Sequence, residues 1–263
     1  EHHETASSEL IDKRGPLRHI LVCLDNSAFA EESLPFAALI GRKFKSHIEL
    51  THVLEARTNG PTPHPHDALD WQIARVEAED YLASVAARMD AAPGIVTSTV
   101  LQGRAPDQII ARAKRDAVDL IILSSHGENG PSPWPLGSTA EKIVARPPSS
   151  ILVVPVAGVG KPPPKVNEIQ RVLVLLDGSP RAENVLPLLE WLVQETELQL
   201  VLLHATRPLD VFHQNNGVVD GAERLEEIEE WNQRRAERYL ARLRGRLSRE
   251  GCHVEAIVEP GDP

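Results

Sequence analysis

The sequence predicts an α/β fold in which a doubly wound, five-stranded parallel sheet occurs in two tandem copies, the second of them incomplete. Short aliphatic runs alternate with longer segments whose apolar residues have helical spacing, a pattern typical of parallel strands joined by helical crossovers. The runs lack strict polar alternation, as expected for strands covered on both faces. The segment HILVCLDNSAFAEESLP recurs 152 residues later as RVLVLLDGSPRAENVLP, which indicates an internal repeat.

The first copy is expected to contain the five strands of the sheet and the helices that connect them. The strands are the aliphatic runs at 19–24, 48–53, 97–101, 119–123 and 150–156. A helix between the second and third runs is indicated by the spacing of Leu69, Ile73, Val76, Tyr81, Leu82 and Val85. Further helices are predicted from about Ala28, at 106–116 and at 139–146.

The repeat sets the domain boundaries. The Pro- and Gly-rich segment 157–168 is predicted to be a linker between a domain at 17–156 and a second domain at 169–263. AEDYLA in the first copy matches AERYLA in the second at an offset of 158, so six residues (158 − 152) are inserted before that helix. Only two residues follow Gly261, the counterpart of Gly103, and we expect the second domain to be C-terminally incomplete.

Composition narrows the functional classes. The 263 residues, 41% hydrophobic and 25% charged, suit one large or two ordinary soluble domains, and two are favoured. The net charge of −10 argues against a nucleic-acid-binding surface, which needs clustered Lys and Arg. Two cysteines without framework spacing fit a reducing compartment, and no apolar run approaches the ~20 residues of a membrane span. We therefore expect a cytoplasmic protein that binds neither nucleic acid nor membrane.

The stretch SSHGENGPSPWPLGSTAEKIV, residues 124–144, follows the fourth predicted strand and is the main candidate for a ligand site. Ser138 and Glu141 have the spacing of a capping box, which predicts that a helix starts at Ser138. Free N–H groups at that helix start would face the loop and could hold a phosphate group.

Several of these motifs together resemble the universal stress protein family. They are DNSAFAEESL after the first strand, HV at the end of the second, GRAPDQI at 103–109, and DLIILSSHG followed nine residues later by GS. The resemblance implies an adenine nucleotide alpha hydrolase-like fold. In members that bind ATP it implies a motif G-x2-G-x9-G-[S/T], whose second glycine falls on Gly127, third on Gly137 and hydroxyl on Ser138, while Ser124 occupies the first glycine position.

The resemblance also implies a set of nucleotide contacts. Asp25 would face the nucleotide and, in some members, its Mg²⁺ or Mn²⁺, and Val53 would offer its backbone to the adenine. The expected nucleotide-binding residues are Asp25, Val53, Ser124, His126, Gly127, Gly137, Ser138 and Thr139. No complete nucleotide site is expected in the second domain, and the two domains are expected to pair as an intrachain pseudo-dimer that further chains could join.

Alternatives stay open at several of these residues. If position 124 requires φ > 0, a serine costs about 1–2 kcal/mol, and if it requires close approach, the side chain could block the ligand. Pro131, Pro133 and Pro135 remove three N–H donors from the loop. Asp25 could instead cap the helix near Ala28, and a single His126 beside a turn is more often structural.

Three functions follow. The first is a stress-response or signalling module that binds ATP or a related adenine nucleotide in the first domain without efficient turnover. The second is an interaction or dimerisation module that binds no nucleotide and pairs through the outer strand 150–156. The third is a slow nucleotide hydrolase, although the sequence has no P-loop, nucleophile elbow or zinc motif. His64, His66 and Asp67 are weak metal candidates in a Pro-rich segment that favours an extended loop.

Overall fold

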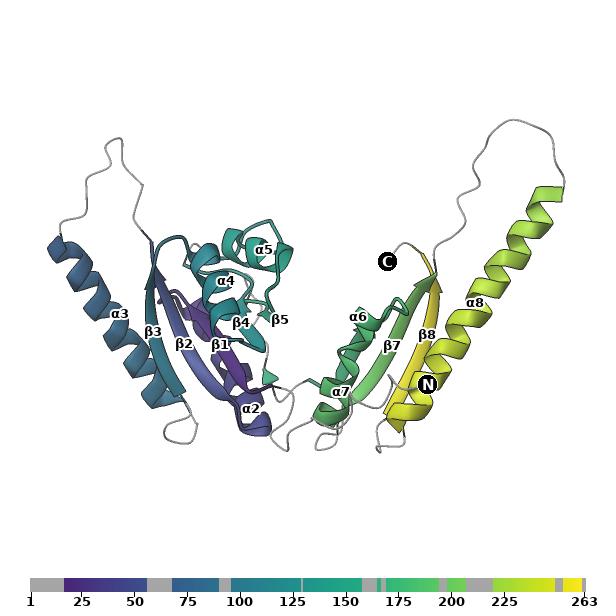
Figure 1. Ribbon diagram of the computed structural model, residues 1–263, viewed down its shortest axis with the longest axis horizontal. Helices are drawn as coiled ribbons and strands as arrows, with labels where there is room; N and C mark the ends of the chain where they lie inside the picture. Colours follow the sequence, from purple (N-terminus) through teal and green to yellow (C-terminus); the bar gives the residue numbers. More distant parts are fainter. Residues whose placement is uncertain are drawn as a thin grey trace. The chain divides into compact units, whose positions relative to one another are not determined.

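The computed structural model describes residues 17–55, 68–89, 96–128, 130–157, 165–166, 169–193, 198–206, 220–248 and 253–261. Contacts divide the chain into two compact units, residues 1–168 and 169–263, which are called unit 1 and unit 2 below. Each unit contains a parallel sheet and flanking helices (Figure 1).

Unit 1 contains a five-stranded sheet with the order β3-β2-β1-β4-β5, in which every pair of neighbours is parallel. The prediction of a doubly wound, five-stranded parallel sheet is therefore confirmed. The strands lie close to the predicted runs, and β4 extends one residue further than expected, to Ser124. Their bounds are His19–Leu24 (β1), His47–Leu54 (β2), Val96–Gln102 (β3), Leu120–Ser124 (β4) and Ser150–Val154 (β5).

Helices cover both faces of this sheet. They are α1 (Ala28–Glu31), α2 (Leu34–Phe44), α3 (Ala68–Arg88), α4 (Ala105–Arg115) and α5 (Ser138–Ala145). The helices α2 and α3 cover one face of the sheet, where they contact strands β1 to β3. The helices α4 and α5 pack against each other over the other face (Figure 1). Because successive strand residues point to opposite faces, Leu21, Ile121 and Leu123 all lie in the core beneath α4 and α5.

The prediction of helix α3 is correct, but its apolar positions are not all buried. Leu82 and Val85 are buried, whereas Leu69, Ile73 and Val76 are 59%, 49% and 55% exposed. A helix of 21 residues is about 31 Å long, while the seven-residue strand β3 beside it spans only about 23 Å. The first turns of α3 therefore extend past the sheet that buries its last turns.

Unit 2 contains a three-stranded parallel sheet with the order β6-β7-β8. Its elements are β6 (Arg171–Leu175), α6 (Pro180–Glu183), α7 (Leu186–Val193), β7 (Gln199–Thr206), α8 (Asp220–Leu247) and β8 (His253–Pro260). One face of the sheet packs against α7 and α8 around Leu200, Leu202 and Leu240. On the other face Leu173 and Leu175 are 57% and 68% exposed, so the described residues of unit 2 cover one face of its sheet.

The same backbone contacts occur in both units at the carboxyl ends of the strands. His52 Nδ1 lies 3.0 Å from the carbonyl oxygen of Leu24, and His204 Nδ1 lies 2.7 Å from that of Leu176. The N–H of Gly103 donates to Leu54 in unit 1, and the N–H of Gly261 donates to Thr206 in unit 2, both at 3.0 Å.

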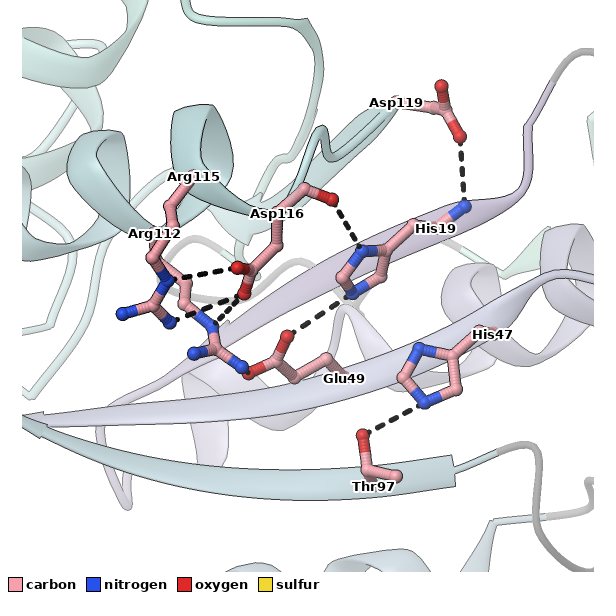
Figure 2. A network of polar contacts seen from close by, with 8 residues as sticks. All are labelled: His19, His47, Glu49, Thr97, Arg112, Arg115, Asp116 and Asp119. Carbon is pink, nitrogen blue, oxygen red and sulfur yellow. Dashed lines mark hydrogen bonds and ion pairs between the residues drawn. The ribbon is translucent and has the colours of Figure 1, made fainter.

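A buried polar network lies at the opposite edge of the unit 1 sheet, where the strands begin (Figure 2). Glu49 of β2, with 2% of its side chain exposed, pairs with Arg112 of α4 at 2.6 Å and with His19 of β1 at 3.2 Å. His47 contacts Thr97 at 3.0 Å on the next strand. This network fixes α4 to the sheet and is separate from the loop that follows β4.

None of the described helices combines the length and hydrophobicity that a membrane crossing requires.

Candidate functional site

The predicted site residues lie at the carboxyl edge of the unit 1 sheet. Asp25 follows β1 and Ser124 ends β4, and these two strands are neighbours. The loop after β4 leads to α5, which begins at Ser138. In open parallel sheets ligands bind at this edge, where neighbouring strands diverge into different connections.

The carboxylate of Asp25 joins two loops. Its Oδ1 accepts the N–H of Ser27 at 3.1 Å and the hydroxyl of Ser27 at 2.5 Å, while Oδ2 accepts the N–H of Glu128 at 2.8 Å. Asn26 between them is left-handed, with φ of 65°. The cap of α1 is Ser27, whose Oγ accepts the N–H of Ala30, so the alternative that Asp25 caps this helix is wrong.

Gly127 packs directly against Asp25. A Cβ atom at this position would overlap the Oδ2 atom of the Asp25 carboxylate. Glycine is therefore required here for close approach rather than for a left-handed backbone, because Gly127 is not among the residues with positive φ. At Gly137 a Cβ would lie 3.3 Å from the carbonyl oxygen of Ser125, a tighter contact than most side chains make.

Ser124 sits in the last position of β4 without backbone strain. The non-glycine residues of the described chain with left-handed φ are Asn26, Lys45 and Ala117, so the cost considered for a serine at φ > 0 does not arise. The buried Ser124 hydroxyl donates to the carbonyl of His126 at 2.6 Å. The serine therefore ties the end of the strand to the first turn of the loop.

The ring of His126 is used within the loop itself. Its Nδ1 lies 3.1 Å from Ser125 Oγ, and its Nε2 lies 3.2 Å from Ser132 Oγ and 3.0 Å from the carbonyl of Trp134. The residue is 9% exposed. Both ring nitrogens thus have loop partners, as the structural interpretation of this histidine predicts.

The prolines shape the segment that His126 supports. Pro131, Pro133 and Pro135 surround Trp134, whose side chain is 74% exposed. Gly130, with φ of 70°, donates its N–H to the carbonyl of Gly127 at 2.8 Å and closes a turn before the first proline. The fixed φ of each proline and the contacts to His126 preorganise this loop.

Helix α5 begins at Ser138, as predicted, but without the predicted capping box. The N-cap is Gly137 in an extended conformation, and no side chain caps the helix. Ser138 is the first helical residue instead, because the Gly137 carbonyl accepts the N–H of Glu141 at 2.9 Å. The N–H groups of Ser138, Thr139 and Ala140 have no acceptor within the described part of the chain. They form an uncapped, positively polarised helix end that suits an anion.

The remaining predicted residues lie nearby. Val53 is the penultimate residue of β2 and packs, half-buried, on the core beneath α4 and α5. His52 has a lowered pKa because burial outweighs the opposing effects of the Leu24 carbonyl, Asp25 and Glu128. The imidazole is therefore neutral near pH 7, and the charged groups beside it are carboxylates.

Sequence reasoning missed three contributors to the site. Ser27 could have been found from the D-x-S pattern, in which the serine rather than the aspartate caps the helix. Ser125 accepts the N–H of Val156 through its Oγ at 3.1 Å, and Glu128 contributes only its backbone, so neither leaves a signal in the sequence.

The weak metal candidates His64, His66 and Asp67 lie outside the described residues. Within the described ranges no group of three or more His, Cys, Asp or Glu side chains is arranged to hold a metal ion.

Comparisons with known proteins agree with this architecture. Among solved structures, a universal stress protein from Archaeoglobus fulgidus DSM 4304 matches with 20% identity over 95% of this chain and 79% of its own, with a TM-score of 0.63. A putative universal stress protein from Pseudomonas aeruginosa UCBPP-PA14 matches with 16% identity over 93% and 76% of the two chains, with a TM-score of 0.58. These likenesses show the fold. A search of curated proteins found no match.

The family model provides the assignment. A model described as the universal stress protein family matches residues 16–155, which is more than half of the chain. This range contains β1 to β5 and the whole loop from Ser124 to Ser138. The chain belongs to the universal stress protein family.

Proposed function

We propose that unit 1 binds ATP or a related adenine nucleotide and acts as a stress-response or signalling module without efficient turnover. The observation that carries the proposal is the uncapped start of α5, where three successive N–H groups lack an acceptor among the described residues. The Gly137 cap lies beside Ser125 and His126, in the same loop whose Gly127 packs against Asp25. The spacing of Gly127, Gly137 and Ser138 supports it. Family membership supports the fold in which such a site would be built.

The helix start is the proposed phosphate position. The N–H groups of Ser138 and Thr139 donate to phosphate oxygens, and the Ser138 hydroxyl, exposed at the first helical position, adds a further donor. Charge-assisted hydrogen bonds contribute roughly 1.5–3 kcal/mol each, and micromolar affinity needs about 8 kcal/mol. Three such bonds together with base contacts at the end of β2, where Val53 lies, suffice for that affinity.

Two carboxylates near His52, at the carboxyl edge of the sheet, favour a cation with the nucleotide. Asp25 and Glu128 both lie close enough to influence the pKa of His52, and an unaccompanied triphosphate would be repelled by them. Oδ1 of Asp25 accepts both the N–H and the hydroxyl of Ser27, whereas Oδ2 accepts one N–H, from Glu128, and keeps a further lone pair. Asp25 is therefore the residue that would hold a nucleotide-bound Mg²⁺ or Mn²⁺, whose chemistry is to neutralise phosphate charge.

The hydrogen bonds that Asp25 and His126 make within the site support slow nucleotide hydrolysis. A general base must have a free acceptor near the attacking water. Oδ1 of Asp25 is occupied by Ser27, the lone pair that Oδ2 keeps is the one proposed for the cation, and His126 has loop partners at both nitrogens. In this arrangement both side chains support the loop shape, and neither is positioned to activate water.

Titration calorimetry with Mg-ATP tests the proposal. Ser138→Glu places a negative charge at the first helical position, where it stabilises the helix dipole but repels phosphate, so binding should be lost while the fold stays intact. The matched control is Ser84→Glu, which adds the same charge at an exposed position of α3 and should leave the affinity unchanged. Equal affinity in both variants, or no heat for the unmodified protein at millimolar Mg-ATP, would sink the proposal.

A second candidate function is a pairing module that binds no nucleotide. It is favoured by β5, an edge strand of apolar residues whose only sheet neighbour is β4 among the described strands. Such an edge offers unpaired backbone groups to another chain. If Val153→Lys converts a dimer to a monomer in light scattering, this function gains support.

Pairing of the two units with each other and a cytoplasmic location stay predictions. Cross-linking with mass spectrometry tests the first, and cell fractionation tests the second.

A further inference from the structure

We propose that unit 2 contains a second ligand site, which takes a small hydroxylated molecule carrying two or more phosphate groups. The site is a cavity of about 590 Å³ between α8 and the carboxyl ends of β6 and β7. Its volume falls within the roughly 300–1,000 Å³ of small-molecule sites. No residue of unit 1 lines it, so the site is independent of the nucleotide binding proposed above.

One wall of the cavity is a row of arginines on α8. Arg235, Arg238 and Arg242 all line it, and their spacing of three and four residues places them on one helix face along about 10 Å. A row of this length exceeds what a single phosphate group needs and fits a ligand with two.

These arginines lack the acidic partners that Arg234 and Arg246 of the same helix have. Arg234 pairs with Glu230 at 2.6 Å, and Arg246 pairs with Glu190 at 2.6 Å. Across the part of the chain that the structure describes, no carboxylate forms an ion pair with Arg235, Arg238 or Arg242. In a chain with a net charge of −10, three guanidinium groups without acidic partners around one cavity indicate an anionic ligand.

Aromatic rings hold two of the guanidinium groups in place. Arg235 lies over the ring of Trp231 at 5.4 Å, and Arg242 lies over the ring of Tyr239 at 5.6 Å. A guanidinium stacked in this way keeps its N–H edge free for planar, bidentate contact with phosphate.

The fold itself does not require this basic wall. At the offset of 158 residues, Arg235, Arg238 and Arg242 correspond to Glu77, Asp80 and Ser84 of α3 in unit 1. The aromatic partner is the same in both helices, since Tyr239 packs edge-on against His204 as Tyr81 does against His52. Equivalent packing is thus built with acidic or neutral residues in unit 1, and the three arginines serve something other than packing.

The opposite wall supplies acceptors for hydroxyl groups. Asp177 lines the cavity, and hydrogen bonds from Ser179 lower its pKa, which keeps the carboxylate ionised. His204 donates Nδ1–H to the carbonyl of Leu176, which leaves Nε2 for a hydrogen bond with a ligand. Asp177 would repel phosphate, so the ligand lies with its phosphate groups toward α8 and its hydroxyl groups toward Asp177.

Titration calorimetry with fructose 1,6-bisphosphate on the full chain tests the site. The double variant Arg238→Gln/Arg242→Gln should weaken binding at least about tenfold, because two charge-assisted contacts are lost. The matched control Arg234→Gln/Arg244→Gln removes the same charge from exposed positions of α8 that do not line the cavity, and should change affinity less than about twofold. All four arginines are exposed, so both variants should fold, which circular dichroism checks.

Three further measurements decide what a positive result means. Binding should persist in Ser138→Glu, and its loss there would assign the ligand to unit 1 and overturn the proposal. Inorganic pyrophosphate should bind more weakly than the sugar bisphosphate, and equal affinity would refute the role of Asp177 and His204 in binding hydroxyl groups. Equal weakening in the two arginine double variants would show nonspecific charge attraction and refute the site.

Discussion

The carboxylate of Asp25 accepts the backbone N–H of Glu128 at 2.8 Å and thereby joins two loops that are 103 residues apart in the sequence. One loop leaves β1 and the other leaves β4, and the helix start proposed to bind phosphate follows the second. The geometry of the site therefore depends on a side chain that also maintains the local fold.

Asp25→Ala should lower the free energy of unfolding of unit 1 by about 2–3 kcal/mol, because hydrogen bonds to a charged acceptor are lost and the N–H of Glu128 is left without its partner. Urea denaturation measures the loss, and faster hydrogen exchange of the peptide containing Glu128 assigns it to unit 1. Asp177→Ala is the matched control. Among the described residues, Asp177 accepts a hydrogen bond only from Ser179 in its own turn. Asp177→Ala should therefore cost less unfolding free energy than Asp25→Ala. Equal losses would contradict the bridging role.

Ser124→Gly should not improve nucleotide affinity, although it restores the glycine that the family motif has at this position. The backbone of Ser124 is extended, so glycine relieves no strain, and the variant loses the hydrogen bond to the His126 carbonyl. We expect a loss of about 1 kcal/mol in stability. Ser124→Ala isolates the hydroxyl from the added backbone freedom. A tenfold gain in affinity for Mg-ATP in Ser124→Gly would show instead that the serine side chain blocks the ligand.

Arg112→Ala should be among the most damaging single substitutions in unit 1. It removes the partner that lies 2.6 Å from Glu49 and leaves the buried carboxylate with His19 as its remaining ion-pair partner among the described residues (Figure 2). We expect a loss of about 3 kcal/mol, measured by urea denaturation. Arg115→Ala, on the same helix but 61% exposed, should cost less than about 0.5 kcal/mol. Similar effects of the two substitutions would contradict a structural role for the buried pair.

Unit 1 should lose stability as the pH falls below about 6.5, in part through His47. Burial and the neighbouring His19 lower the pKa of His47, and the attraction of Glu49 opposes this only in part. The unfolded chain therefore binds more protons between the folded and unfolded pKa values, so the free energy of unfolding decreases as the pH is lowered through this window and is fully retained above it. Urea denaturation between pH 8 and pH 5 should show that the free energy of unfolding depends less steeply on pH in His47→Gln than in the unmodified protein. Parallel curves for the two proteins would exclude His47 as a contributor.

The strands and their order were predictable because aliphatic runs without polar alternation, separated by helical segments, are typical of parallel strands buried on both faces. The sequence could not predict which part of α3 is buried. Helical spacing shows which residues share a face, but not how far the helix extends past the sheet that covers it. Leu69 and Val85 look equivalent in sequence, yet one is exposed and the other buried.

The site was predictable as a location but not as a hydrogen-bond network. The pattern S-x-x-E placed the cap of α5 on Ser138, because a side-chain rule does not recognise an extended Gly137 that takes the cap position. Whether Ser124 needs a left-handed backbone depends on where β4 ends, which is a tertiary property. Glu49 stands out as a charge within an apolar run, but its partner Arg112 is 63 residues away and on a different element.

The contact between Asp25 and Gly127 also limits how the site can vary. Because a methyl group at 127 would occupy the space of the Asp25 carboxylate, Asn at position 25, which has nearly the same shape, would still demand glycine at 127. A shorter residue at 25 would remove that demand and the loop bridge together. Substitutions at positions 25 and 127 are therefore coupled, and a mutant library designed to change the ligand preference of this protein must randomise both positions together.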